Sequence, residues 1–128
     1  MLNHVFREHN KIADALTKNV TDCITLLVPP ATFAKCERFT FHFDGSHNNT
    51  TGYSSCAWVC LGVTSNQATV YTSSELEMLA IGSWELPNGT SAVNAELVAF
   101  SSALDIAIAI SRASIVHHTA TCVAPMVP

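Results

Sequence analysis

The segment Phe39–Ser46 constrains the fold of this chain more than any other. Up to Asp44, its aromatic residues stand at odd positions and its polar residues at even positions. This period of two is typical of a strand with one face in the core. The strand ends at Asp44, directly before Gly45. Packing does not require a carboxylate there, so Asp44 is either the cap of a turn or part of a metal site.

Composition indicates one folded domain. The chain has 128 residues, of which 48% are apolar and 12% charged, enough apolar material for a core. The most apolar stretch, Val98–Val116, is interrupted by Asp105 and Arg112, so no membrane span is predicted. No export signal is visible, and the five cysteines contain no CxxC pair. We therefore expect free thiols and an intracellular location, cytoplasmic or nuclear.

The charge balance does not favour nucleic-acid binding. The formal net charge is −4, and five of the six basic residues precede position 39. An acidic domain does not attract phosphates through bulk charge. A role on nucleic acid would need bound cations or the basic N-terminal segment.

The first 38 residues predict a helix and a linker. Residues 5–18 have helical apolar periodicity. Residues 19–38 have no long pattern and are expected as a linker, with Ile24–Val28 as a candidate short strand. The pair Pro29-Pro30 predicts that no helix runs through this segment.

The rest of the chain predicts a sheet. Strands are expected at 39–44, 54–63 and 68–72, joined by short polar turns as an antiparallel meander. Residues 78–86 could continue the sheet, and 114–123 could form one more strand.

A long helix is predicted at 92–112, with Thr90 or Ser91 as its N-cap. It carries one stripe of large apolar residues: Val93, Leu97, Phe100, Leu104 and Ile108. Glu96 lies beside that stripe, on a side lined with alanines that would let the helix pack close to the sheet. Asp105 is expected to face water.

Three motifs together resemble the ribonuclease H (type 1) family in its plant and retroelement form. One is the strand that ends in Asp44-Gly-Ser, and another is the helix that opens with Asn94-Ala-Glu96-Leu. The third, His4-Val-Phe-Arg-Glu-His-Asn10-Lys-Ile-Ala-Asp14-Ala-Leu, resembles the last motif of the family. The resemblance covers about residues 2–18 and 39–116.

The resemblance implies an α/β fold in which a mixed sheet contains a three-strand antiparallel meander followed by a helix. It implies an RNA–DNA hybrid endoribonuclease that hydrolyses the RNA strand with two Mg²⁺ ions, or Mn²⁺. Asp44 would bridge the metals, Glu96 and Asp14 would each support one, and His4 would shuttle protons. Carboxylates are the ligands that Mg²⁺ prefers, and paired ions activate water and neutralise phosphate. A flanking reverse transcriptase or second ribonuclease H-like domain is a further implied partner.

The chain departs from the family in two ways. The last motif precedes the first, so residues 1–18 would end one unit, 19–38 link, and 39–128 begin another; a circular permutation is the second explanation. The next acid of the family is missing near Ile115-Val116, where His117 and His118 stand instead. Adjacent residues point to opposite faces of a strand, so this pair is a poor metal replacement. The later strand and helix of the family are absent too, which makes the fold incomplete.

Two other functions remain open. One is a catalytically inactive remnant that binds nucleic acid weakly. The other is a small α/β interaction domain in which Asp44 only caps a turn. The second predicts that Asp14, Asp44 and Glu96 lie far apart.

Overall fold

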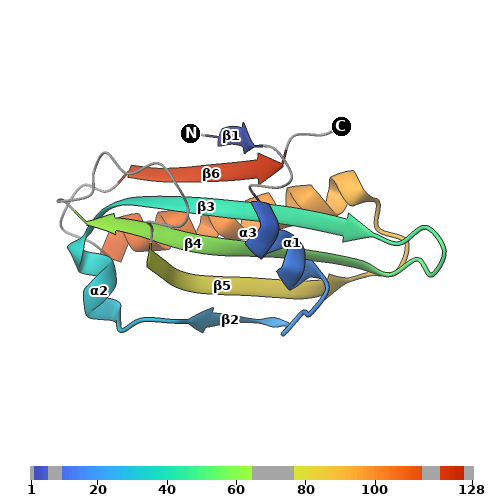
Figure 1. Cartoon of the computed structure of the whole chain (residues 1–128), viewed down its shortest axis with the longest axis horizontal. Coiled ribbons are helices and arrows are strands. Elements are labelled where there is room, and N and C mark those ends of the chain that lie inside the picture. Colours follow the sequence, from blue (N-terminus) through green and yellow to red (C-terminus); the bar gives the residue numbers. More distant parts are fainter. Residues whose placement is uncertain (1, 6–9, 65–76, 114–118, 126–128) are drawn as a thin grey trace.

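The chain forms one six-stranded mixed sheet with helices on both faces (Figure 1). The computed structural model describes residues 2–5, 10–64, 77–113 and 119–125, and only the backbone at 2–5, 30, 34, 37, 64, 111–113 and 119–125. The strands are β1 (Leu2–Val5), β2 (Cys23–Leu26), β3 (Cys36–His47), β4 (Ser54–Thr64), β5 (Glu77–Leu86) and β6 (Thr119–Pro125). The helices are α1 (Lys11–Thr17), α2 (Pro30–Lys35) and α3 (Ala92–Ala113). The sheet order is β1-β6-β3-β4-β5-β2.

Strands β3, β4 and β5 form the predicted antiparallel meander, and β2 extends it antiparallel to β5. On the other side, β6 pairs parallel to β3, and β1 pairs parallel to β6. The mixed α/β architecture with a meander and a following helix is therefore confirmed. The third meander strand is β5 at 77–86, whereas the expected strand at 68–72 lies outside the described residues.

The first 38 residues contribute more to this sheet than predicted. The expected helix at 5–18 is shorter, because β1 occupies Leu2–Val5 and α1 begins at Lys11. The expected linker carries β2 and α2. Pro30 does not prevent α2, since it stands in the first turn, where the missing N–H has no helical partner to lose. One sheet thus contains strands from all three predicted segments.

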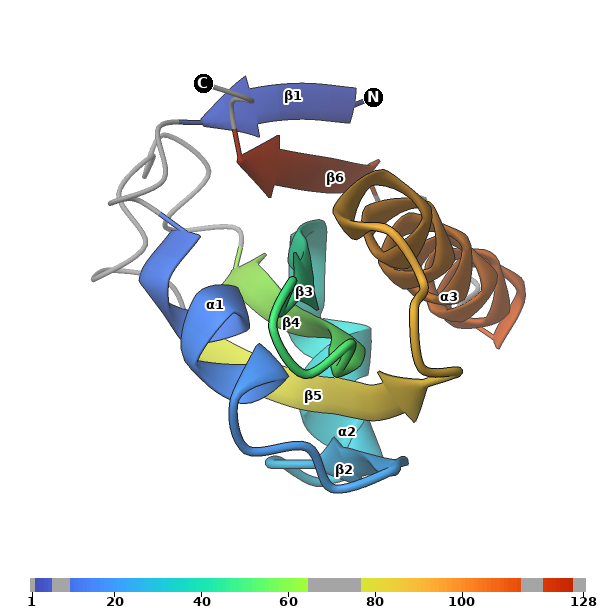
Figure 2. The ribbon, with the colours of Figure 1, turned by 90° about the vertical axis from the view of Figure 1, so that its right-hand side faces the viewer.

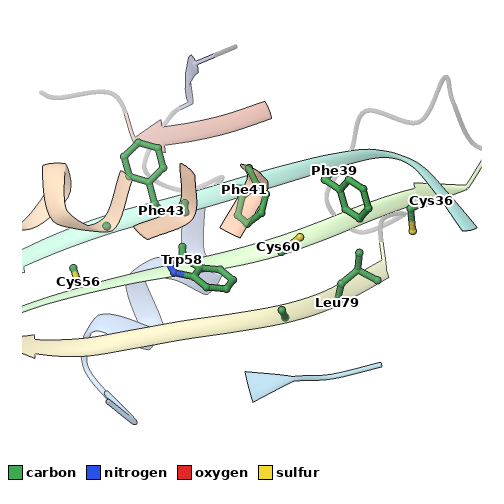
Figure 3. Close-up of a cluster of buried hydrophobic side chains, with 12 residues drawn as sticks. Cys36, Phe39, Phe41, Phe43, Cys56, Trp58, Cys60 and Leu79 are labelled. Atoms are coloured by element: carbon green, nitrogen blue, oxygen red, sulfur yellow. The ribbon is translucent and has the colours of Figure 1, made fainter. Parts of the chain in front are cut away.

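The core lies between the phenylalanine face of β3 and helix α3 (Figure 3). Phe41 packs edge-on against Trp58 with ring centroids 5.7 Å apart, and Phe43 packs on Phe100 at 5.3 Å. Trp58 is fully buried, and its indole N–H donates to Ser102 Oγ on α3 at 3.0 Å. Helix α1 packs on β3 and β4 from the opposite face of the sheet (Figure 2).

Helix α3 packs through its small residues. The buried face consists of alanines at four-residue spacing, namely Ala95, Ala99, Ala103 and Ala107. Of the predicted large stripe, only Phe100 packs on the core, and Val93, Leu97, Leu104 and Ile108 are exposed. The aromatic rings of β3 and β4 already fill the layer, so only a small-residue face can approach them. Ser91 Oγ accepts the backbone N–H of Asn94 at 3.2 Å, which confirms Ser91 as the N-cap.

Helix α3 is apolar enough, from Ala92 to Ile110, to cross a membrane by length and composition alone. The sequence had predicted no such segment, because Asp105 and Arg112 interrupt the window at 98–116. The candidate window begins earlier and ends before Arg112. Its alanine face packs against the sheet, whereas most of its large apolar side chains are exposed.

Candidate metal site

Asp44 stands where β3 leaves the core. It is on the face of β3 opposite the three phenylalanines, and only 9% of its surface is exposed. One carboxylate oxygen, Oδ1, accepts the backbone N–H of Gly45 at 2.9 Å. The strand does not end at Asp44 as predicted, because β3 continues to His47 and pairs Asp44 with Ala57 and Gly45 with Cys56. The bond therefore lies within the strand and caps no turn. The surroundings of the carboxylate include two further acids.

Helix α1 brings Asp14 to Asp44. Two hydrogen bonds fix the helix to the sheet: Asn10 Nδ2 donates to the carbonyl of Phe43 at 2.9 Å, and Ser55 Oγ donates to the carbonyl of Thr17 at 2.6 Å. Asn10 and Asp14 are one helical turn apart, so anchoring Asn10 beside Phe43 holds Asp14 near the next residue of β3. The side chain of Asp14 forms a hydrogen bond with that of Asp44.

The second turn of α3 brings Glu96 near the end of β3, because Gly45 has no side chain. A Cβ at Gly45 would overlap the backbone nitrogen of Glu96 and the carbonyl carbon of Ala95. The backbones of β3 and α3 are therefore in direct contact one residue after Asp44. From there, the negative charge of Glu96 acts on the Asp44 carboxylate.

The environment of Asp44 disfavours its charged form. Burial, followed by the charge and hydrogen bond of Asp14, raises the pKa of Asp44 to about 7. The hydrogen bond from the Gly45 amide lowers this pKa, and the charge of Glu96 raises it by the smallest amount. Asp14 has a partial counter-charge, since Lys18 Nζ lies 3.2 Å from its Oδ2. Both members of that pair are partly exposed, so the bridge contributes little to stability.

The donor set suits a hard divalent cation only in part. Asp14 and Asp44 are adjacent oxygen donors, and buried Asn10 Oδ1 has no hydrogen-bond partner, which leaves a third oxygen close to this pair. Among the described residues, however, no three acidic, histidine or cysteine side chains stand in an arrangement that could hold a metal ion. The carboxylates converge on Asp44, but they do not form a three-ligand cluster.

Strand β6 pairs with β3 only as far as His42. Parallel pairing sets His42 of β3 against Val123 of β6, two residues before Asp44. The acid of the family was expected to be missing near Ile115-Val116, and these residues lie outside the described part of the chain. The described strand β6, Thr119–Pro125, carries no acidic residue.

The histidines give little support to the site. His4 lies in β1, with its backbone paired to Ala124 of β6, two strands from β3; its role as a proton shuttle stays a prediction. His117 and His118 lie outside the described residues. His42 shares the polar face of β3 with Asp44, and burial lowers its pKa.

Two features of the site were not predicted from sequence. The contact of Gly45 with α3 could not be seen, because a Gly after a strand indicates only a turn. The second feature is the ion pair between Lys18 and Asp14. Its four-residue spacing on a helix is a signal from which it could have been predicted.

Comparisons of the chain with protein-family models, with curated proteins and with solved structures found no match.

Proposed function

We propose that this chain is a ribonuclease H-like domain that hydrolyses the RNA strand of an RNA–DNA hybrid slowly, with divalent cations at Asp44, Asp14 and Glu96. The observation that carries the proposal is that two further acids, Asp14 of α1 and Glu96 of α3, act on the buried carboxylate of Asp44 in β3. Packing energy does not favour this arrangement, because like charges in a buried site oppose one another.

The arrangement of the sheet supports the same proposal. The ribonuclease H resemblance implies a meander, a helix, and then parallel strands beside the first one. Here β6 and β1 occupy parallel positions beside β3, and α1 covers the opposite face from α3. We infer that the N-terminal strand and helix serve as the later elements of a single domain, in place of those that the sequence had predicted to be absent. This favours a permuted domain over a junction between two domains.

The chemistry follows from the carboxylates. Mg²⁺ held by Asp44 and Asp14, with support from Glu96, would activate water and neutralise the phosphate charge. Asp44 must be ionised to bind a cation, so its raised pKa predicts weak binding below pH 7. Asn10 keeps Asp14 close to Asp44.

A second candidate is a non-catalytic remnant with weak nucleic-acid binding. It is favoured by the missing three-ligand cluster among the described residues and by β6, which carries no acidic residue. Removing one carboxylate from a multi-acid site lowers cation affinity and hence hydrolysis. The interaction-domain alternative requires the acids to be far apart, and it is opposed by the hydrogen bond between the side chains of Asp14 and Asp44.

Cleavage of a labelled RNA–DNA hybrid tests the proposal. The protein is incubated at pH 8 with Mg²⁺ and, separately, with Mn²⁺. Asp44→Asn is tested in parallel, with Asp105→Asn as the matched control, because Asp105 is an exposed acid of α3. We expect slow cleavage of the RNA strand that is lost in Asp44→Asn and kept in Asp105→Asn. Equal cleavage by all three proteins would reject the proposal.

A binding measurement separates the two candidates. Mg²⁺ should raise the melting temperature of the wild type at pH 8 and leave that of Asp44→Asn unchanged, because a ligand stabilises the state that binds it. Stabilisation by Mg²⁺ without hybrid cleavage would assign the remnant. Neither stabilisation nor cleavage would reject both.

A further inference from the structure

Asn10 carries a buried oxygen that has no partner among the described residues. Only 1% of its surface is exposed, and its Oδ1 accepts no hydrogen bond from this part of the chain. Asn10 is the N-cap of α1, where a side-chain oxygen ordinarily accepts a backbone N–H of the first turn, but it forms no such capping bond. Leaving a buried acceptor unpaired destabilises a fold, so such an atom points to a bound ion or water.

A hydrogen bond fixes the direction of this oxygen. Nδ2 of Asn10 donates to the carbonyl of Phe43 at 2.9 Å, a bond that only the nitrogen of the amide can form. Because the amide is rigid and planar, the bond at Nδ2 also fixes Oδ1. Asp44 follows Phe43 directly in β3, and Asp14 stands one turn after Asn10 on the same face of α1. The amide group is therefore held next to the two acids.

These three side chains make a donor set for a divalent cation. The side chains of Asp14 and Asp44 are joined by a hydrogen bond, which requires a proton on one of them. A divalent cation can take the place of that proton and neutralise both carboxylates. Within the described ranges, no acid, histidine or cysteine completes a three-ligand group with this pair. The amide oxygen of Asn10 can take the third place without adding charge, since Mg²⁺ and Ca²⁺ prefer oxygen ligands and Asn carbonyls are among them.

We propose that Oδ1 of Asn10 is the third protein ligand of a divalent cation held by Asp14 and Asp44. The inference rests on the cation site of the proposed function, although it does not require hydrolysis. It gives Asn10 a second task beside anchoring α1, because Nδ2 binds the sheet while Oδ1 binds the cation. Glu96, whose charge affects the Asp44 carboxyl least, then acts on the cation through its charge and not as a ligand.

Calorimetric titration with Mg²⁺ at pH 8, without nucleic acid, tests the ligand. Asn10→Ala should weaken Mg²⁺ binding by at least about tenfold, because losing even an outer partner of a metal ligand has an effect of this size. The matched control is Ser55→Ala. It removes the other hydrogen bond between α1 and the sheet, from Ser55 Oγ to the carbonyl of Thr17, and leaves the three ligands in place. We expect Ser55→Ala to bind Mg²⁺ much more tightly than Asn10→Ala does.

Asn10→Asp separates a ligand from an anchor. The substitution keeps an oxygen at the Oδ1 position and loses the N–H that donates to the Phe43 carbonyl. If the oxygen is a ligand, Asn10→Asp should recover most of the affinity that Asn10→Ala loses, since a carboxylate is also a ligand that Mg²⁺ prefers. If Asn10 only anchors α1, the two variants should bind Mg²⁺ equally weakly.

The wild-type amide gives a direct readout that does not depend on the folding of any Asn10 variant. The NMR signal of the Asn10 side-chain amide should shift when Mg²⁺ is added, because a cation at Oδ1 polarises the amide. Exposed Asn19 is the control in the same spectrum, and its signal should stay in place. In Asp44→Asn, Mg²⁺ should leave both signals unchanged.

Three results would each overturn the inference: equal Mg²⁺ affinity in the wild type and Asn10→Ala, binding by Asn10→Asp as weak as that by Asn10→Ala, or a fixed Asn10 signal in a wild type that binds Mg²⁺. A wild type that binds no Mg²⁺ would overturn both this inference and the cation site of the proposed function. Binding that depends on Asn10, in a protein that cleaves no hybrid, would support the inference and reject hydrolysis alone.

Discussion

The two faces of the sheet differ in the kind of group that they bury. The face under α3 is apolar, and there the rings of β3 and Trp58 meet a helix face of alanines. The face under α1 buries polar groups at its edge, among them Asn10, Thr17 and Asp44. The first face gains stability from the removal of apolar surface from water. The second holds a carboxylate whose ionisation its surroundings oppose.

This difference separates stability from function within one domain. An apolar core tolerates no polar group without a partner, whereas the polar face keeps both a crowded carboxylate and an unpartnered amide oxygen. Substitutions on the α3 side should therefore destabilise the protein. Substitutions of the acids on the α1 side should stabilise it or change how it responds to pH.

The largest loss is expected at Trp58. Trp58→Ala leaves a cavity beneath α3 and removes the hydrogen bond to Ser102, so the free energy of unfolding should fall by about 3–5 kcal/mol. Urea denaturation measures this, with Trp84→Ala as the control, since Trp84 is only partly buried on the same face. A loss smaller than that of Trp84→Ala would contradict the description of this core.

Asp44→Asn should raise the free energy of unfolding, whereas Trp58→Ala lowers it. Asp44 has a pKa of about 7 in the folded protein and an ordinary value of 3.8 in the unfolded chain. Between pH 3.8 and pH 7, Asp44 is therefore protonated in the folded protein and ionised in the unfolded chain. The free energy of unfolding of the wild type should therefore fall as pH rises from about 4 to about 7, by up to about 4 kcal/mol. Asp44→Asn should lack this contribution and be the more stable protein above pH 7.

Denaturation at a series of pH values checks this expectation. Asp105→Asn, at an exposed acid of α3, should keep the slope of the wild type. An unchanged slope in Asp44→Asn would show that Asp44 ionises normally.

Gly45→Ala tests where the two faces meet. Its Cβ would overlap the backbone of α3 at Ala95 and Glu96, and a backbone cannot rotate away as a side chain can. We expect a loss of about 1–3 kcal/mol from overpacking. Thermal denaturation measures it beside the neighbouring Ser46→Ala, and a Gly45→Ala protein as stable as that control would refute the contact.

Asn10→Ala should have the smallest effect on stability. It removes the hydrogen bond to the Phe43 carbonyl, worth about 1 kcal/mol, and also removes an amide oxygen that has no partner. Because Asp14 is then held less firmly beside Asp44, the pH at which stability falls should move downward. The same pH series measures this, and exposed Asn19→Ala should leave it in place.

Part of the fold was predictable because it depends on local pattern. Alternation alone predicted β3 with its phenylalanine face, and the polar turns predicted an antiparallel meander. The prediction that α3 packs on the sheet through its alanine side is confirmed, whereas the exposure of most of its large apolar stripe was not predicted. Which face packs depends on how much of the layer the sheet already fills, and that requires both partners.

The residues of the candidate site were predictable from the sequence, but their contacts were not. The resemblance named Asp44, Asp14 and Glu96, each within its expected element. Their proximity depends on long-range contacts, namely Asn10 with Phe43 and Gly45 with α3, which no local pattern encodes.

The pairing of β1 with β6 has a kinetic consequence. Leu2 pairs with Cys122, so this edge of the sheet closes only when nearly the whole chain has been ordered. Contacts so distant in sequence form slowly, after the local hairpins of β3, β4 and β5. β1 should therefore be the last strand to form during refolding and the first whose amides exchange with solvent. Because α1 follows β1 directly in sequence, the order of folding also sets when Asp14 reaches Asp44.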